Sequence, residues 1–189
     1  MIELTIIRYA DATPINLSLN PNALAVANSE YVNGSASNAI DGVHLTMWNA
    51  GDWATSSKHY VLTIDIGDVH PVNSIVLKSG ASTPNPAYYI NYMLFTSVDN
   101  INWDTIVAFD RLIDSADGYF DIIDTGTTLT RYVKFEVTGG THWAHLVEAE
   151  IWGDSSTPAP EPTTILLLGS CLFGLVGFRR KFRNKSKLS

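Results

Sequence analysis

Short apolar or alternating runs, separated by clusters of Gly, Asn, Asp, Ser and Pro, fill the chain between Asn16 and Trp152. The clearest runs are residues 60–66, 72–77, 92–97, 131–137 and 146–152. In the last two, alternate residues can face a core while the charged ones face solvent or a loop. No stretch before Thr163 keeps helical apolar spacing for three turns. This pattern predicts an all-β domain and disfavours a helical or doubly wound fold.

The length of 189 residues fits one domain with a distinct C-terminal tail. Without that tail, about 155 residues remain, and a domain of this size buries roughly 70% of its unfolded surface. The single cysteine, Cys171, lies in an apolar stretch of the tail, so no disulfide within the chain is expected. The domain must therefore be stabilised by its core.

Charge is divided unevenly along the chain. All 19 acidic residues lie at or before Glu161, whereas six of the 12 Lys and Arg residues follow it, which leaves a formal charge of −13 on residues 1–161. The basic residues of this part are scattered and form no stripe. Because such a body repels phosphate backbones, we expect no nucleic-acid partner.

The tail has three parts. Residues 154–162 form a polar, Pro-rich linker, residues 163–178 are uncharged and mostly apolar, and residues 179–189 are basic. Sixteen residues make a helix of about 24 Å, slightly short of the roughly 30 Å hydrocarbon core of a membrane. We predict a single transmembrane helix over 163–178 with a basic cytoplasmic tail and the body outside. The alternative is a buried core helix or a frayed terminus.

The order of features in the tail resembles the PEP-CTERM sorting signal. Its motif is Pro160-Glu161-Pro162, followed by the apolar segment and then by Arg179 and Arg180. The resemblance implies processing by an exosortase and passage from a single-pass inner-membrane precursor to the cell surface or extracellular matrix. Residues 1–9 lack the features of a signal peptide. We favour a start codon assigned too far downstream, and a tail-anchored cytosolic protein is the competing topology.

The order of segments in the body resembles discoidin, or coagulation factor type C, domains. The segments are residues 36–42, 46–48, 62–67, 97–103, 131–135 and 147–153. The resemblance implies a galactose-binding-like jelly-roll β-sandwich over residues 16–153, preceded by an N-terminal segment, 1–15. Members of this family bind sugars, lipid head groups or proteins through loops at one end, so the ligand does not follow from the fold.

The same resemblance implies a structural Ca²⁺ site. Its ligands would be Asp41, Thr46 and Glu148, and such oxygen donors suit this ion. Val43 and Leu45 occupy places that are often polar in the family, where main-chain carbonyls would have to serve. The alternative is that Asp41 forms only an Asx-turn before Gly42.

Aromatic residues on loops suggest a carbohydrate site, because an aromatic ring can stack on the apolar face of a sugar while polar groups bind its hydroxyls. The alternative is that these side chains pack under their own loops. The predicted ligand-binding residues are Trp53, His59, Tyr88, Tyr89 and Asn85. For Trp48, Trp103 and Trp152 we expect burial in the core.

Two further chemistries receive little support. His142 and His145 flank Trp143, but a zinc site would need a third ligand nearby. The chain contains no Gly-x-Ser-x-Gly, no His-Glu-x-x-His and no phosphate-binding loop. We expect a non-catalytic module for carbohydrate binding or adhesion in extracellular polysaccharide. The alternatives are a structural matrix protein and, more weakly supported, a glycan-active enzyme.

Overall fold

The computed structural model describes residues 13–79, 88–114 and 119–154. Most of these residues lie in β-strands, as expected, and the rest form turns and two short 3-10 helices. The strands are β1 (Ile15–Asn16), β2 (Leu24–Ala27), β3 (Trp48–Trp53), β4 (Tyr60–Ser79), β5 (Tyr88–Ser97), β6 (Asp104–Asp114), β7 (Tyr119–Gly140), β8 (Trp143–Leu146) and β9 (Glu148–Gly153), and the 3-10 helices are η1 (Leu17–Leu19) and η2 (Ala36–Ile40).

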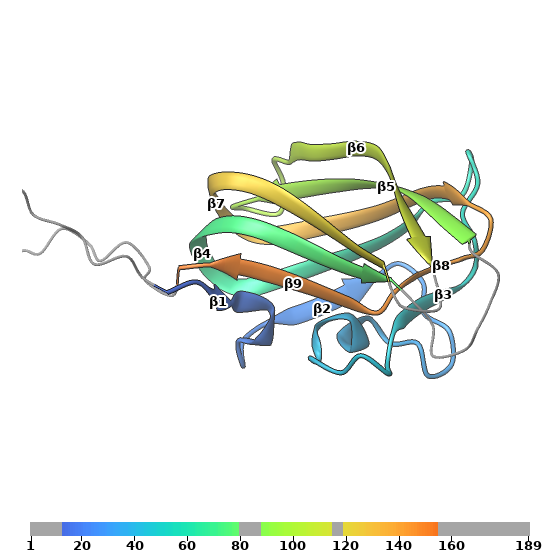
Figure 1. Ribbon diagram of the computed structural model, residues 1–189, viewed down its shortest axis with the longest axis horizontal. Coiled ribbons are helices and arrows are strands. Elements are labelled where there is room, and N and C mark those ends of the chain that lie inside the picture. Colours follow the sequence, from blue (N-terminus) through green and yellow to red (C-terminus); the bar gives the residue numbers. More distant parts are fainter. Residues whose placement is uncertain (1–12, 80–87, 115–118, 155–189) are drawn as a thin grey trace, which may run out of the picture. The chain divides into compact units, whose positions relative to one another are not determined.

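Two long antiparallel strands, β4 and β7, organise the domain (Figure 1). They pair from Tyr60 opposite Val137 to Ser79 opposite Tyr119, and both bend so that each contributes to two layers. One layer contains β2, the first half of β4, the second half of β7, β5 and β6. The other contains the remaining halves with β9 and β1. This arrangement confirms the all-β sandwich.

The bend in β4 joins two of the expected strands into one. Its register with β7 shifts between Asp65 and His70, and Gly67 there has a φ of 95°, which favours glycine. The Asp65 carboxylate accepts two hydrogen bonds from the Arg131 guanidinium, at 2.9 and 3.0 Å. Sequence periodicity showed the two halves but not their continuity, because a bulge interrupts the alternation.

The core lies between the two layers and is built from the alternate side chains of their strands. Phe135 is central, since its ring lies 6.3 Å from that of Trp48 and 5.1 Å from that of Tyr92. Trp48 is buried, as predicted. Trp103 and Trp152 are instead half-buried and lie outside the core, so the prediction was wrong for them. Trp103 stacks under Lys134, and the Trp152 indole N–H donates to Glu150.

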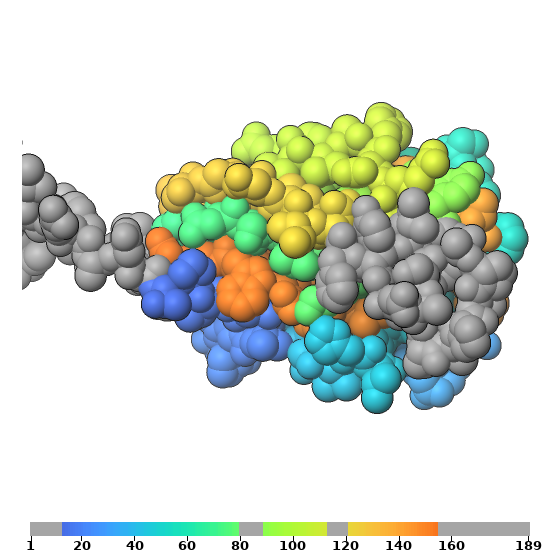
Figure 2. All heavy atoms as spheres, in the orientation of Figure 1, coloured from blue at the N-terminus to red at the C-terminus, as the bar shows by residue number. Residues whose placement is uncertain are grey.

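The two ends of the sandwich differ. At one end β1 pairs with the end of β9, with Ile15 opposite Gly153, and Figure 2 shows the blue N-terminal residues against the orange closing strand. A Cβ on Gly153 would lie 2.3 Å from the Pro71 carbonyl oxygen, so only glycine fits there. At the other end lie β3, β8 and the start of β5 (Figure 1). We call this second end the loop end.

No helix among residues 13–79, 88–114 and 119–154 is long and apolar enough to cross a membrane. The expected membrane segment, 163–178, lies outside the described residues, as do the 160–162 motif, Arg179, Arg180 and Asn85. The single-span topology therefore stays a prediction.

Candidate functional site

Three exposed aromatic side chains gather at the loop end. Trp53 at the end of β3 lies opposite Trp143 at the start of β8, and the Trp143 ring lies 5.9 Å from that of Tyr31. Their exposed fractions are 50% for Trp53, 39% for Trp143 and 53% for Tyr31, so all three can reach a ligand in solvent. We call Tyr31, Trp53 and Trp143 the aromatic cluster.

The local sequence explains how the cluster forms. Tyr31 begins a tight turn in which the Gly34 N–H donates to the Tyr31 carbonyl at 2.8 Å, and Asn33 adopts a φ of 67°. Gly51, with a φ of 82°, lies under the Tyr31 ring, and a Cβ there would approach the ring within 2.9 Å. The absence of a side chain at Gly51 therefore decides where Tyr31 lies.

Two polar residues close to Trp53 in the sequence, Asp52 and His59, add hydrogen-bonding capacity. Asp52 pairs with Lys58, and the Trp53 N–H donates to Asp52 Oδ1 at 2.8 Å; the Lys58 contact is the main cause that lowers the pKa of Asp52. His59 Nδ1 lies 2.8 Å from Glu136 Oε1, which orients the imidazole ring. Aromatic faces beside fixed polar groups can bind a sugar through both its apolar face and its hydroxyls.

Tyr89 is hydrogen-bonded to Thr141, which precedes Trp143 of the aromatic cluster by two residues. The Tyr89 N–H donates to Thr141 Oγ1 at 3.3 Å, and the Thr141 N–H donates to the Tyr89 carbonyl at 3.0 Å. Arg111 places its guanidinium carbon 4.6 Å from the centre of the Tyr89 ring. Tyr88 precedes Tyr89 on β5, and its side chain is outside what the structure describes.

The structure thus brings Trp53 together with two aromatics that sequence reasoning missed as ligands, Tyr31 and Trp143. Trp143 carried a signal, since it closely follows a Gly-Gly pair and stands between two histidines. Tyr31 carried none, because its role depends on a contact across the fold. The assignment of Trp53, His59 and Tyr89 to sugar binding stays a prediction.

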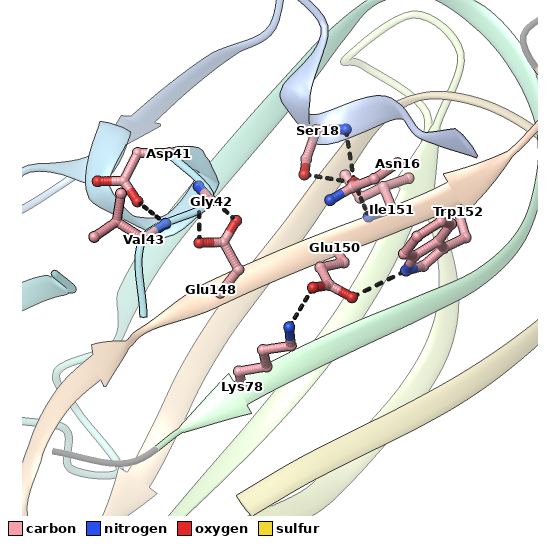
Figure 3. A network of polar contacts seen from close by, with 10 residues as sticks. All are labelled: Asn16, Ser18, Asp41, Gly42, Val43, Lys78, Glu148, Glu150, Ile151 and Trp152. Carbon is pink, nitrogen blue, oxygen red and sulfur yellow. Dashed lines mark hydrogen bonds and ion pairs between the residues drawn. The ribbon is translucent and has the colours of Figure 1, made fainter. Parts of the chain in front are cut away.

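A second polar site lies where η2 ends, beside the start of β9 (Figure 3). Glu148 is 1% exposed, and its carboxylate accepts the Gly42 N–H at 3.2 and 3.4 Å. Thr46 donates its hydroxyl to Asp41 Oδ2 at 2.8 Å. Asp41 Oδ1 accepts the Val43 N–H at 2.8 Å, so the Asx-turn is also present. Thr46 thus contacts Asp41, and Glu148 contacts the neighbouring Gly42, so the three predicted calcium ligands belong to one local network, and their role in binding the ion stays a prediction.

The charge on Glu148 is only partly compensated, by the Gly42 N–H and by the more distant Lys78. Burial raises its pKa to about 7, and the nearby negative charge of Asp41 contributes in the same direction. Because burying an uncompensated carboxylate is costly, a cation among these oxygens would relieve the penalty. No group of three or more His, Cys, Asp or Glu side chains suited to a metal occurs in residues 13–79, 88–114 and 119–154. Main-chain carbonyls would have to complete the coordination.

Two family matches divide the chain. Residues 25–150 match the F5/8 type C domain, and residues 158–181 match the PEP-CTERM protein-sorting motif. Galactose oxidase of Gibberella zeae is 24% identical over 155 residues, which make up 80% of this chain and 23% of that protein. The chain therefore spans less than a quarter of the length of this curated relative.

Solved structures share the fold. A chitosan-binding module of a chitosanase/glucanase from Paenibacillus sp. IK-5 is 25% identical, with a TM-score of 0.56 over 74% of this chain and 99% of that module. The family 32 carbohydrate-binding module of NanJ from Clostridium perfringens, solved with galactose, is 18% identical, with a TM-score of 0.60 over 74% and 99%. These likenesses confirm the expected jelly-roll sandwich.

Proposed function

Because this chain belongs to the F5/8 type C domain family, we propose that its body is a non-catalytic carbohydrate-binding module, exported to the cell surface or into extracellular polysaccharide. The observation that carries the proposal is the aromatic cluster. Three exposed rings from separate segments meet at the loop end, where nothing in the described core requires them. Solved relatives in complex with galactose and with a galactose-containing disaccharide support the same ligand class.

Binding would follow from the chemistry of the cluster. Rings stack on the apolar face of a pyranose, and each buried aromatic contact contributes affinity beyond its area. Asp52 and His59, each already oriented by a partner, supply acceptors and donors for hydroxyl groups. A single shallow site of this kind binds weakly, so display of many copies would provide avidity.

A glycan screen with the full chain tests this proposal. We expect saturable binding that Trp143→Ala and Trp53→Ala each reduce about tenfold or more, which corresponds to roughly 1.4 kcal/mol per ring. The matched control is Ile101→Ala, which removes a side chain that is 79% exposed on the turn before β6, away from the cluster. Absence of binding to any glycan, or equal binding by all variants, would instead favour a structural matrix protein.

We also propose that Asp41, Thr46 and Glu148 hold a structural Ca²⁺. The donor set fits, since all three offer oxygen atoms and Glu148 is a buried carboxylate whose hydrogen bond comes from the main-chain N–H of Gly42. When bound, the ion would neutralise the carboxylates and fix the loop after η2. Its role would be to stabilise the fold near β9.

The sorting motif supports a route to the surface. We propose that residues 163–178 span the inner membrane of a precursor, that Arg179 and Arg180 remain cytoplasmic, and that an exosortase processes the chain near Pro160, Glu161 and Pro162. Fractionation of the native host with intact mass spectrometry tests this. Trimming near 160–162 outside the inner membrane supports the route, whereas a full-length chain on the cytoplasmic face would overturn it.

A further inference from the structure

Arg111 is unusual among the Lys and Arg side chains of the described body. Lys58, Lys78 and Arg131 are each paired with a carboxylate. Lys134 is half-buried, with its ammonium 4.2 Å from the Phe95 ring centre. Arg111 is exposed, and its side chain stacks on the Tyr89 ring. It forms no ion pair with the side chains that the structure describes, which do not include that of Asp114.

The stacked position leaves the guanidinium ready for an anion. A guanidinium lying over an aromatic ring keeps its N–H donors directed outward from its edges. The neighbouring carboxylate, Asp110, is engaged by the main chain, because its Oδ1 accepts the Arg111 N–H at 2.7 Å. Asn91, directly opposite Arg111 on β5, adds a polar side chain beside it. Arg111 is therefore a preorganised cation that forms no ion pair among the described side chains, although Asp110 is its chain neighbour.

Arg111 also lies within reach of the aromatic cluster. Tyr89, on which it stacks, exchanges two hydrogen bonds with Thr141, and Trp143 follows two residues later. Two residues span at most about 7 Å, so Trp143 lies close to Thr141. Figure 1 shows the start of β5, the end of β6 and β8 at the same end of the sandwich. A short oligosaccharide that stacks on Trp143 and runs toward β5 would come near Arg111.

We propose that Arg111 binds the carboxylate of an acidic sugar unit, so that the glycan recognised at the loop end carries uronate or similar carboxylate groups. This rests on the proposed function and names its ligand class. An arginine fork binds a carboxylate through two parallel hydrogen bonds. The formal charge of −13 on residues 1–161 repels polyanions in general. Selectivity for acidic sugars would therefore depend on a locally positioned cation such as Arg111.

A matched pair of ligands tests the proposal. The probe is a uronate-containing oligosaccharide, and its control is the same oligosaccharide with the carboxyl groups reduced to alcohols. We expect the full chain to bind the uronate form about tenfold or more tightly, since hydrogen bonds between charged groups are stronger than those between neutral ones. Arg111→Gln should abolish this preference, so that the variant binds the two forms with equal affinity. Arg111→Lys should retain part of it, because a point charge lacks the fork.

The outcomes separate the two proposals. Equal affinity of the unmodified chain for both ligands would overturn the role of Arg111, as would a preference that survives in Arg111→Gln. Loss of binding to both ligands in Trp143→Ala would still support the glycan site. If Trp143→Ala binds both ligands normally, the proposed glycan site itself fails. Thermal unfolding of each variant verifies that the fold is retained.

Discussion

Gly51 lies directly beneath the ring of Tyr31, and a Cβ on Gly51 would come within 2.9 Å of Tyr31 Cδ2. The glycine also has a φ of 82°, which other residues rarely adopt. The position of Tyr31 next to Trp143 thus depends on a residue that has no side chain. Because of this dependence, a single added methyl group can disturb the geometry of the aromatic cluster.

Gly51→Ala should displace Tyr31 and weaken glycan binding severalfold, with a loss of stability of roughly 1–2 kcal/mol from backbone strain. Gly126→Ala is the matched control, because Gly126 also has a positive φ, 55°, but a Cβ there would meet no atom within 4 Å beyond its chain neighbours. It should carry the backbone strain without affecting binding. Calorimetry and thermal unfolding measure the two effects. Equal loss of binding in both variants would contradict the role of Gly51.

Calcium should raise the Tm of the full chain. A ligand at a hundred times its Kd stabilises the folded state by about 2.7 kcal/mol. Glu148→Gln and Asp41→Asn should each abolish the Tm increase measured with CaCl₂ by differential scanning fluorimetry. Glu150→Gln is the control on the same strand, because Glu150 pairs with Lys78 instead. A Tm increase that persists in Glu148→Gln, or none in the unmodified chain, would rule out this site.

Asp99 should make stability depend on pH. Main-chain N–H groups of Asn102 and Ile101 donate to Asp99 at 2.8 and 2.9 Å and hold the pKa of its carboxyl well below the ordinary value of 3.8. A lowered folded-state pKa stabilises the fold above 3.8, and this contribution is lost as the pH falls toward the folded-state pKa. Asp99→Ala should therefore lower Tm at pH 7.

The effect of pH on Tm, compared between the unmodified chain and Asp99→Ala, tests this role of Asp99. The difference in Tm between the unmodified chain and Asp99→Ala should be constant above about pH 4.5 and narrow as the pH falls below 3.8, since Asp99 becomes protonated mainly in the unfolded chain there. Thermal scans across pH measure it. A Tm difference that widens as the pH falls would contradict stabilisation of the turn by the Asp99 carboxylate.

Phe135→Ala should destabilise the domain by about 3–5 kcal/mol, because it leaves a cavity between Trp48 and Tyr92. Phe109→Ala is the control, since that ring is 74% exposed on β6. It should change the free energy of unfolding by less than about 1 kcal/mol. Denaturant unfolding measures both. Similar effects of the two substitutions would show that the core is not centred on Phe135.

The sequence by itself determined that the body is all-β and where most strands lie. Alternation over residues 131–137 predicts a strand with one buried face, and Val133, Phe135 and Val137 are buried there. The sequence also predicted the positions of the turns, because Gly, Asn and Asp are favoured in turns for local reasons. Such features depend on neighbouring residues alone, so they are visible without the fold.

Only the tertiary structure decided which side chains meet. Tyr31 and Trp143 are far apart in the sequence, and their contact depends on the turn after β2, the register of β3 with β8 and the space above Gly51. Arg111 became distinctive only once every other described Lys and Arg side chain was placed. Trp103 and Trp152 were expected in the core but are half-buried outside it, because burial depends on which layer covers a residue. Contacts of this kind are set by long-range packing, which no local period encodes.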